Sequence, residues 1–261
     1  MKTIAKKTTA HTTRRAYRRH HVKFTLNGVS KNVMGIKVWQ IVSLENFTIG
    51  TPQGERRVKK GQVGGWIEGK RNLSHLGSCW IDVDAVVTGG ARVKENAYVG
   101  GKAVLLGNSI ACGAAKIVDL ALLNQQALVG ENATVGGAAW VGNDAKVLGS
   151  AVVEGLSRLS GRAIVSGTAR IDGAEVGCQA VVTAGSYEGK RARRATVKIS
   201  GSARLTTDVS VVASSLDQKI WICKNTTSTG GVHLRGDATS SKGKTLKLNG
   251  KQALAGFAAT A

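Results

Sequence analysis

Proline and aromatic residues are scarce in this 261-residue chain, which contains 1 Pro, 5 Trp, 3 Tyr and 3 Phe. It has no run of 18 apolar residues, so the sequence predicts no transmembrane helix. The first 24 residues lack the apolar core of a secretory signal, although their basic, acid-free composition overlaps with that of a mitochondrial transit peptide. The cysteines are widely spaced and form no Cys-x-x-Cys pair, which favours reduced thiols over a zinc site: Cys79, Cys112, Cys178 and Cys223.

The dominant positive feature is a six-residue period. From Ala85 to Ala169 every sixth residue is alanine or serine, and the second residue after each of them is apolar. A period of six is typical of a parallel β-helix, in which each unit supplies one short strand and one corner and three units complete a triangular coil. We therefore expect an all-β protein whose core is a left-handed parallel β-helix, a hexapeptide-repeat solenoid with a small β N-terminal cap and basic flanking arms.

The same register assigns directions to the side chains. The small and the apolar residues of each unit are expected to face inward, whereas Lys94 and Tyr98 are expected to face outward. Glycine recurs near the turns, where a positive φ costs it nothing. Residues beside those glycines also tolerate left-handed backbone, which predicts that conformation at Asn96, Asn108, Asn132 and Asp144.

The period changes towards the C-terminus. It slips by one residue after Ala169, as a one-residue deletion at a corner would produce, and it breaks over residues 187–194, where we expect a basic loop to leave the coil. It returns in part at Ala203, Leu205, Val209 and Val211. At the other end, strands are expected over 22–28, ending in an Asn27-Gly28 turn, and over 34–42 and 47–49.

These patterns predict four regions. Residues 1–24 form a basic arm, residues 25–63 a β-rich N-terminal cap, and residues 64–186 the hexapeptide β-helix. Residues 187–261 form a basic C-terminal region that is partly β-helical and then a tail. A solenoid needs caps at its ends because the terminal coils have no neighbour on one side.

Charge is distributed unevenly among these regions. The formal net charge is +21, yet residues 71–189 hold 9 Lys and Arg against 10 Asp and Glu. Residues 1–70 hold 15 against 3, and residues 190–261 hold 13 against 3. The surplus of positive charge therefore lies outside the regular coil, which is the electrostatic footprint of nucleic-acid binding.

The residues expected to contact phosphates come from both flanks, with Tyr17 placed among arginines where it could stack on a base. They are Lys6, Lys7, Arg14, Arg15, Tyr17, Arg18, Arg19, Lys23, Lys190, Arg191, Arg193, Arg194 and Lys198. An acidic protein surface in a larger assembly, another polyanion, or no partner are the alternatives. A membrane is disfavoured because the arms lack an amphipathic apolar face. A homo-oligomer is also expected, with a trimer as one form.

A family resemblance lies between residues 60 and 185. The elements Gly64-Gly65-Trp66-Ile67-Glu68 and Asn72-Leu73-Ser74, followed by the hexapeptide run, resemble the YdcK-like hexapeptide-repeat proteins of bacteria and their phages. The resemblance implies a left-handed β-helix and a bacterial or phage origin, hence a cytoplasmic or virion-associated location. It does not imply a reaction, because the transferase label of the family rests on similarity of fold.

Histidine argues against catalysis in the coil. Acyltransferases on such coils generally use a histidine general base, and a zinc carbonic anhydrase of this fold needs three histidine ligands. None of the 5 histidines lies between residues 76 and 232, which leaves His75 as a lone candidate base. The sequence thus favours a non-catalytic scaffold that binds nucleic acid, without cofactor or metal. The alternatives are a structural virion or host-complex-docking protein and an acyltransferase-like enzyme.

Overall fold

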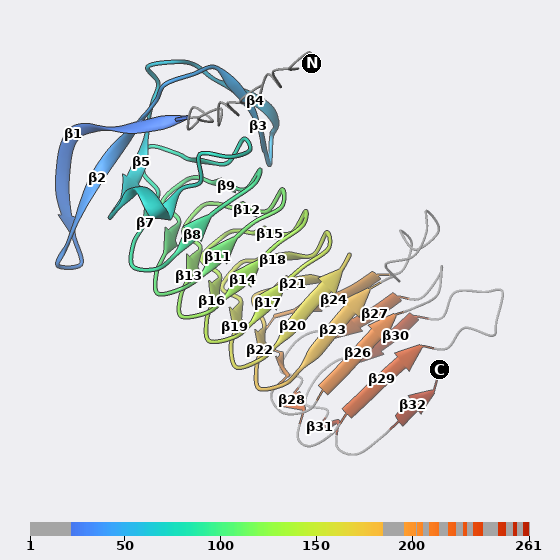
Figure 1. Cartoon of the computed structure of the whole chain (residues 1–261). Helices are drawn as coiled ribbons and strands as arrows, with labels where there is room; N and C mark the ends of the chain where they lie inside the picture. The colour runs from blue at the N-terminus through green and yellow to red at the C-terminus, as the bar shows by residue number, and fades with distance from the viewer. Residues whose placement is uncertain are drawn as a thin grey trace, which may run out of the picture.

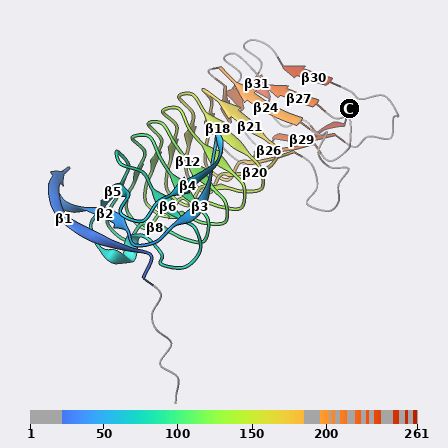
Figure 2. The same cartoon turned by 90° about the horizontal axis from the view of Figure 1, so that it is seen from above.

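The structure is a computed structural model. It describes residues 22–184, 196–201, 203–205, 209–213, 219–222, 227–228, 232–236, 245–248, 253–254 and 258–260. In these residues the chain is built from short strands, with one 3₁₀ turn, η1 (Lys70–Asn72). The strands stack as successive coils along one axis, with the cap at one end and β29 to β32 at the other (Figures 1 and 2).

Each coil contributes one strand to each of three parallel sheets. The first sheet has 12 strands because two antiparallel cap strands and β5 extend it. Its members in sequence order are β1 (Phe24–Val33), β2 (Ile36–Ser43), β5 (Val63–Ile67), β7 (Val86–Val87), β10 (Val104–Leu105), β13 (Leu122–Leu123), β16 (Trp140–Val141), β19 (Arg158–Leu159), β22 (Glu175–Val176), β25 (Arg204–Leu205), β28 (Thr227–Ser228) and β31 (Ala253–Leu254).

The other two coil sheets have 9 strands each. The β8 sheet consists of β8 (Arg92–Val93), β11 (Ile110–Ala111), β14 (Leu128–Val129), β17 (Lys146–Val147), β20 (Ile164–Gly167), β23 (Val181–Ala184), β26 (Val209–Ala213), β29 (Val232–Gly236) and β32 (Ala258–Thr260). The β6 sheet consists of β6 (Trp80–Ile81), β9 (Tyr98–Val99), β12 (Lys116–Ile117), β15 (Thr134–Val135), β18 (Val152–Glu154), β21 (Arg170–Asp172), β24 (Thr196–Ser200), β27 (Lys219–Ile222) and β30 (Thr245–Leu248).

The interior of the coil confirms the expected β-solenoid. The small and apolar positions of the repeat are buried, as Ala97 and Val99 illustrate with exposed fractions of 0% each. Successive coils stack their aliphatic residues, so Leu105, Leu123 and Val141 lie in one column. Fully burying one such aliphatic side chain contributes about 1.5–3 kcal/mol, and the column runs from Val87 to Leu205.

Strand pairing also confirms the one-residue slip. Trp140 pairs with Arg158, 18 residues later, whereas Arg158 pairs with Glu175, which is one residue nearer. The next coils are longer, because Arg170 pairs with Lys198 and Lys198 with Trp221. The parallel pairing continues on both sides of residues 185–195, and the basic loop predicted over 187–194 lies outside the described residues.

The corners differ from the sequence expectation in one respect. The residue with positive φ is the one before each predicted Asn or Asp. At most corners it is glycine, and at the others it is Glu95, Asp119, Gln125, Glu131, Asn143 or Cys178. A left-handed non-glycine residue costs about 1–2 kcal/mol. At four of these corners the side chain compensates by accepting a backbone N–H 18 residues later: Glu95 from Gly113, Asp119 from Gly137, Gln125 from Asn143 and Glu131 from Gly149.

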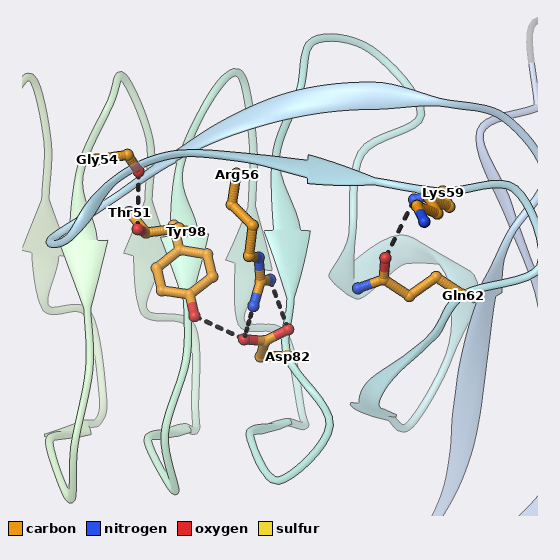
Figure 3. Close-up of polar contacts among 7 residues, drawn as sticks. All are labelled: Thr51, Gly54, Arg56, Lys59, Gln62, Asp82 and Tyr98. Carbon is orange, nitrogen blue, oxygen red and sulfur yellow. Dashed lines mark hydrogen bonds and ion pairs between the residues drawn. The ribbon is translucent and has the colours of Figure 1, made fainter.

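The cap consists of two hairpins. The first pairs β1 with β2 and turns at Met34 and Gly35, both with positive φ, so the predicted turn at Asn27-Gly28 is wrong. Residues around Gly28 instead form an irregularity inside β1, where the pairing register shifts. The second hairpin, β3 (Phe47–Thr51) and β4 (Gly54–Val58), lies across the first strands of the β6 sheet (Figure 3).

A polar cluster fixes this second hairpin to the coil. The guanidinium of Arg56 donates two hydrogen bonds, of 2.8 and 2.7 Å, to the two carboxylate oxygens of Asp82 (Figure 3). The hydroxyl of Tyr98 donates to the same carboxylate at 2.6 Å. Tyr98 therefore lies on the outer face of the coil as expected, yet it is only 6% exposed because the hairpin covers it.

Burial beneath the hairpin raises the pKa of Tyr98, and the bond to Asp82 raises it further. The unfolded chain ionises this phenol near its ordinary pKa of about 10, whereas the folded chain keeps it protonated. Folded protein then binds more protons than unfolded protein, so the free energy of unfolding falls as the pH rises above about 10. We expect Tyr98→Phe to be less stable than wild type at pH 8 and the difference to narrow by pH 11.

Denaturant titrations at the two pH values measure this difference. Tyr17→Phe, outside the described residues, controls for the loss of one tyrosine. A difference in the free energy of unfolding between wild type and Tyr98→Phe that stays constant from pH 8 to pH 11 would contradict the raised pKa.

Candidate polyanion-binding surface

Most of the predicted phosphate contacts fall outside the described residues. This holds for Lys6, Lys7, Arg14, Arg15, Tyr17, Arg18, Arg19, Lys190, Arg191, Arg193 and Arg194. For these residues the assignment stays a prediction. The structure places the remaining two, Lys23 and Lys198, in very different surroundings.

Lys23 requires a correction, because its side chain is 0% exposed and cannot reach a phosphate in this arrangement. Its ammonium donates to the carbonyl oxygens of Gly77 and Cys79 at 3.0 and 2.8 Å and to the Cys79 Sγ at 3.2 Å. Burial lowers the pKa of Lys23 and raises that of the Cys79 thiol.

The position of Lys23 follows from the geometry of the first coil. Backbone N–H groups point to the next coil, as when Trp80 donates to Ala97, so carbonyl groups of the first coil point away from the stack. Unpaired buried carbonyls are costly, and side-chain donors satisfy them here. Lys23 does so for Gly77 and Cys79, and Asn72 donates to the carbonyls of Gly89 and Ala91 at 3.1 and 2.8 Å.

Lys198 lies on the outside of the β6 sheet. It is partly exposed between the buried Val197 and Ile199, and it pairs in register with Arg170 on one side. Its strand, β24, starts two residues after Arg194 in the sequence. The next strands continue the column with Trp221 and Lys247.

A second group of cations lies on the outside of the 12-stranded sheet. The guanidinium of Arg158 stacks over the Trp140 ring, 4.6 Å from the ring centroid. Arg204, two strands further on, pairs with Glu175 at 3.4 Å and keeps 67% of its side chain exposed. The sequence did not indicate Arg158 because the regular coil has almost no net charge, and it did not indicate Arg204 because the coils become irregular in length after Arg158.

His75, the lone candidate base, packs against the start of the cap. Nδ1 of His75 accepts the backbone N–H of Lys23 at 3.3 Å, and its ring stacks on Phe24 with 4.3 Å between centroids. His75 thus packs where the cap meets the first coil. Within the described residues no group of three or more His, Cys, Asp or Glu side chains could hold a metal ion. The one helical turn described, η1, is far shorter than a membrane-crossing helix.

Comparison with known proteins gives a partial match. The chain is 34% identical over 82 residues to a protein named "Uncharacterized acetyltransferase YdcK" from Escherichia coli (strain K12). The match covers 31% of this chain and 22% of that protein, so the chain spans about a fifth of the length of the relative. No family model matches the chain. Together with the β-solenoid, the match supports a hexapeptide-repeat-like fold.

Proposed function

We propose that this protein is a non-catalytic β-solenoid scaffold that binds nucleic acid through the basic regions flanking its regular coil. The observation that carries the proposal is the segregation of charge. Residues 71–189 hold 9 basic and 10 acidic residues, whereas the flanks hold nearly all of the excess behind the net charge of +21. An excess of positive charge that served only solubility would be spread over the outward positions of the coil, which are available in every unit.

The outer sheet surfaces near the C-terminal flank support the same function. Arg158 is exposed and stacks over Trp140, so its guanidinium plane is held outward, where a base can stack on it or a phosphate can bind. Lys198 lies beside Arg170 on the neighbouring strand, about 4.8 Å away, and Arg170 is itself ion-paired with Glu154. Nothing in this arrangement selects a base, so the binding is expected to be independent of sequence.

The salt dependence of binding tests the proposal. Each phosphate contact on duplex DNA contributes about 0.9 to the slope of log affinity against log salt concentration. Replacing the four arginines Arg14, Arg15, Arg18 and Arg19 with glutamine is therefore expected to reduce the slope by about 3 to 4. Fluorescence anisotropy with a labelled duplex and a structured RNA, in full-length protein, measures it.

The matched control replaces the same four arginines with lysine, which preserves the charge. This variant is expected to retain the slope of wild type, because counterion release depends on charge rather than on the guanidinium group. Any truncation of the arm should end at residue 21, since Lys23 belongs to the core. If neither nucleic acid binds at low salt, the basic flanks serve an acidic protein surface instead.

Acetyl transfer is a second candidate because the relative matched over 82 residues carries that name. The described coil offers little for it, since His75 is held between Lys23 and Phe24 at the cap. Turnover of acetyl-CoA by wild-type protein with a panel of amines, abolished by His75→Ala, would establish this function in place of the scaffold.

A further inference from the structure

A hollow of about 450 Å³ lies on the first coils, and none of the phosphate contacts predicted from the sequence lines it. Arg71 of η1 forms one wall, and Arg92 and Lys94 of the β8 region form another. Gly90, Asn108 and Ile110 complete the lining. Residues from η1, β8 and the neighbouring corner, distant in sequence, thus meet around one space.

The lining carries three cations and no carboxylate. Arg71 and Arg92 are exposed and Lys94 is partly buried. Two carboxylates that flank these cations in the sequence accept backbone hydrogen bonds at the corners. Glu68 accepts the backbone N–H of Gly89 at 2.6 Å, and Glu95 accepts that of Gly113 at 2.7 Å. Neither carboxylate lines the hollow, although Glu68 is held at Gly89, next to the lining residue Gly90.

The backbone around the hollow is fixed before any ligand arrives. Asn72 accepts the N–H of Gly69 at 2.8 Å and donates to the carbonyls of Gly89 and Ala91, so it pins η1 to the corner beside β8. A Cβ on Gly90 would lie 2.1 Å from Oδ1 of Asn108, so a side chain there would displace that amide from the hollow. Such fixed backbone reduces the ordering that a ligand must impose on binding.

A second hollow shows that this charge is not a general property of the corners. It also measures about 450 Å³ and lies two coils further along, at the corner column that contains residues 90 and 108. Its lining includes Asp144 opposite Arg162, together with Gln125, Gln126 and Asn143. The cation and the carboxylate balance there, whereas the hollow beside η1 has three positive charges.

We propose that the hollow lined by Arg71, Arg92 and Lys94 is a binding site for a phosphate group. Guanidinium groups match phosphate oxygens with paired, charge-assisted hydrogen bonds, and a lysine adds a point charge. The phosphate can belong to a nucleic-acid backbone or to a free phosphorylated compound. The site goes beyond the proposed function of the flanks, and it stands whether or not the flanks bind nucleic acid.

Calorimetric titration of full-length protein with inorganic pyrophosphate tests the site. Arg92→Ala is expected to weaken binding by about tenfold or more, as expected for losing hydrogen bonds to a charged group. Lys146→Ala is the matched control, because Lys146 occupies the same column of the β8 sheet as Arg92. Both substitutions remove one positive charge. Both side chains are exposed, and thermal unfolding of each variant verifies that the coil is intact.

The outcomes separate the two sources of phosphate. If Arg92→Ala loses affinity for pyrophosphate alone, the site binds a free phosphorylated compound. If it also loses affinity for a short single-stranded oligonucleotide, the site binds backbone phosphates. Equal binding by Arg92→Ala and Lys146→Ala with both ligands overturns the proposal. The arginine variants of residues 14–19 leave this hollow intact, so failure of the proposed function is distinguished from failure of the site.

Discussion

Gly65→Ala is expected to lower the free energy of unfolding by about 1–3 kcal/mol or more, as overpacking of a close contact does. A Cβ built on Gly65 would lie 2.3 Å from the carbonyl oxygen of Asp82 and 2.5 Å from Cγ2 of Ile81. The first of these atoms is backbone and cannot rotate away. Since β5 joins the cap to the first sheet, the change should separate the cap from the coil.

Gly69→Ala provides the control for this prediction. Gly69 has extended backbone with φ of −158° and no atom within 4 Å of a built Cβ, so alanine fits there. Urea titrations and limited proteolysis of both variants measure the stability of the molecule and the release of the cap. Equal stability of the two variants would show that β5 can move away from the coil at little cost.

Leu123→Ala is expected to destabilise the coil by about 2–5 kcal/mol, because truncation of a buried leucine removes transfer free energy and leaves a cavity. Leu123 is 0% exposed, and its neighbours in the column, Leu105 and Val141, belong to adjacent rigid coils. The regular hydrogen bonds between coils limit the collapse that could fill the space. Thermal and urea unfolding measure the loss.

Leu122→Ala removes the same atoms from the adjacent residue, which is only partly buried on the outer face of the strand. We expect it to cost less than about 1 kcal/mol, the range of most surface substitutions. A loss as large as that of Leu123→Ala would falsify the assignment of the inner face, unless another molecule covers the outer one.

The regular coil was predictable because its signal repeats. Positions such as Ala97 and Val99 recur every six residues, and a period of that length is typical of a parallel β-helix. The hairpin over Tyr98 was not predictable, because the contact between Arg56 and Asp82 joins segments with no shared period. The turn at Met34 escaped prediction for a similar reason, since Asn27-Gly28 is the stronger local turn signal and pairing with β2 overrode it.

The candidate sites were predictable only in part. Charge segregation identifies the flanks from the sequence alone, and Lys198 does lie on an outer sheet surface. A lysine that donates to buried carbonyls cannot be told in a sequence from one that binds phosphate, so the prediction that Lys23 contacts phosphate was wrong. The phosphate hollow needs Arg71 and Arg92 around one space, which depends on η1 lying against β8.

Because stacked strands are evenly spaced, the number of coils between two points on the solenoid fixes the distance between them. From β8, beside the phosphate hollow, to β23, after which the basic residues 187–194 follow, the β8 sheet takes five steps. At about 4.8 Å each, this is a separation of about 24 Å. A mononucleotide cannot reach across it, whereas an extended oligonucleotide can. Adding or removing one coil of 18 residues would change the span by a single step and leave both ends intact, so the length of ligand that engages both is set by the number of coils.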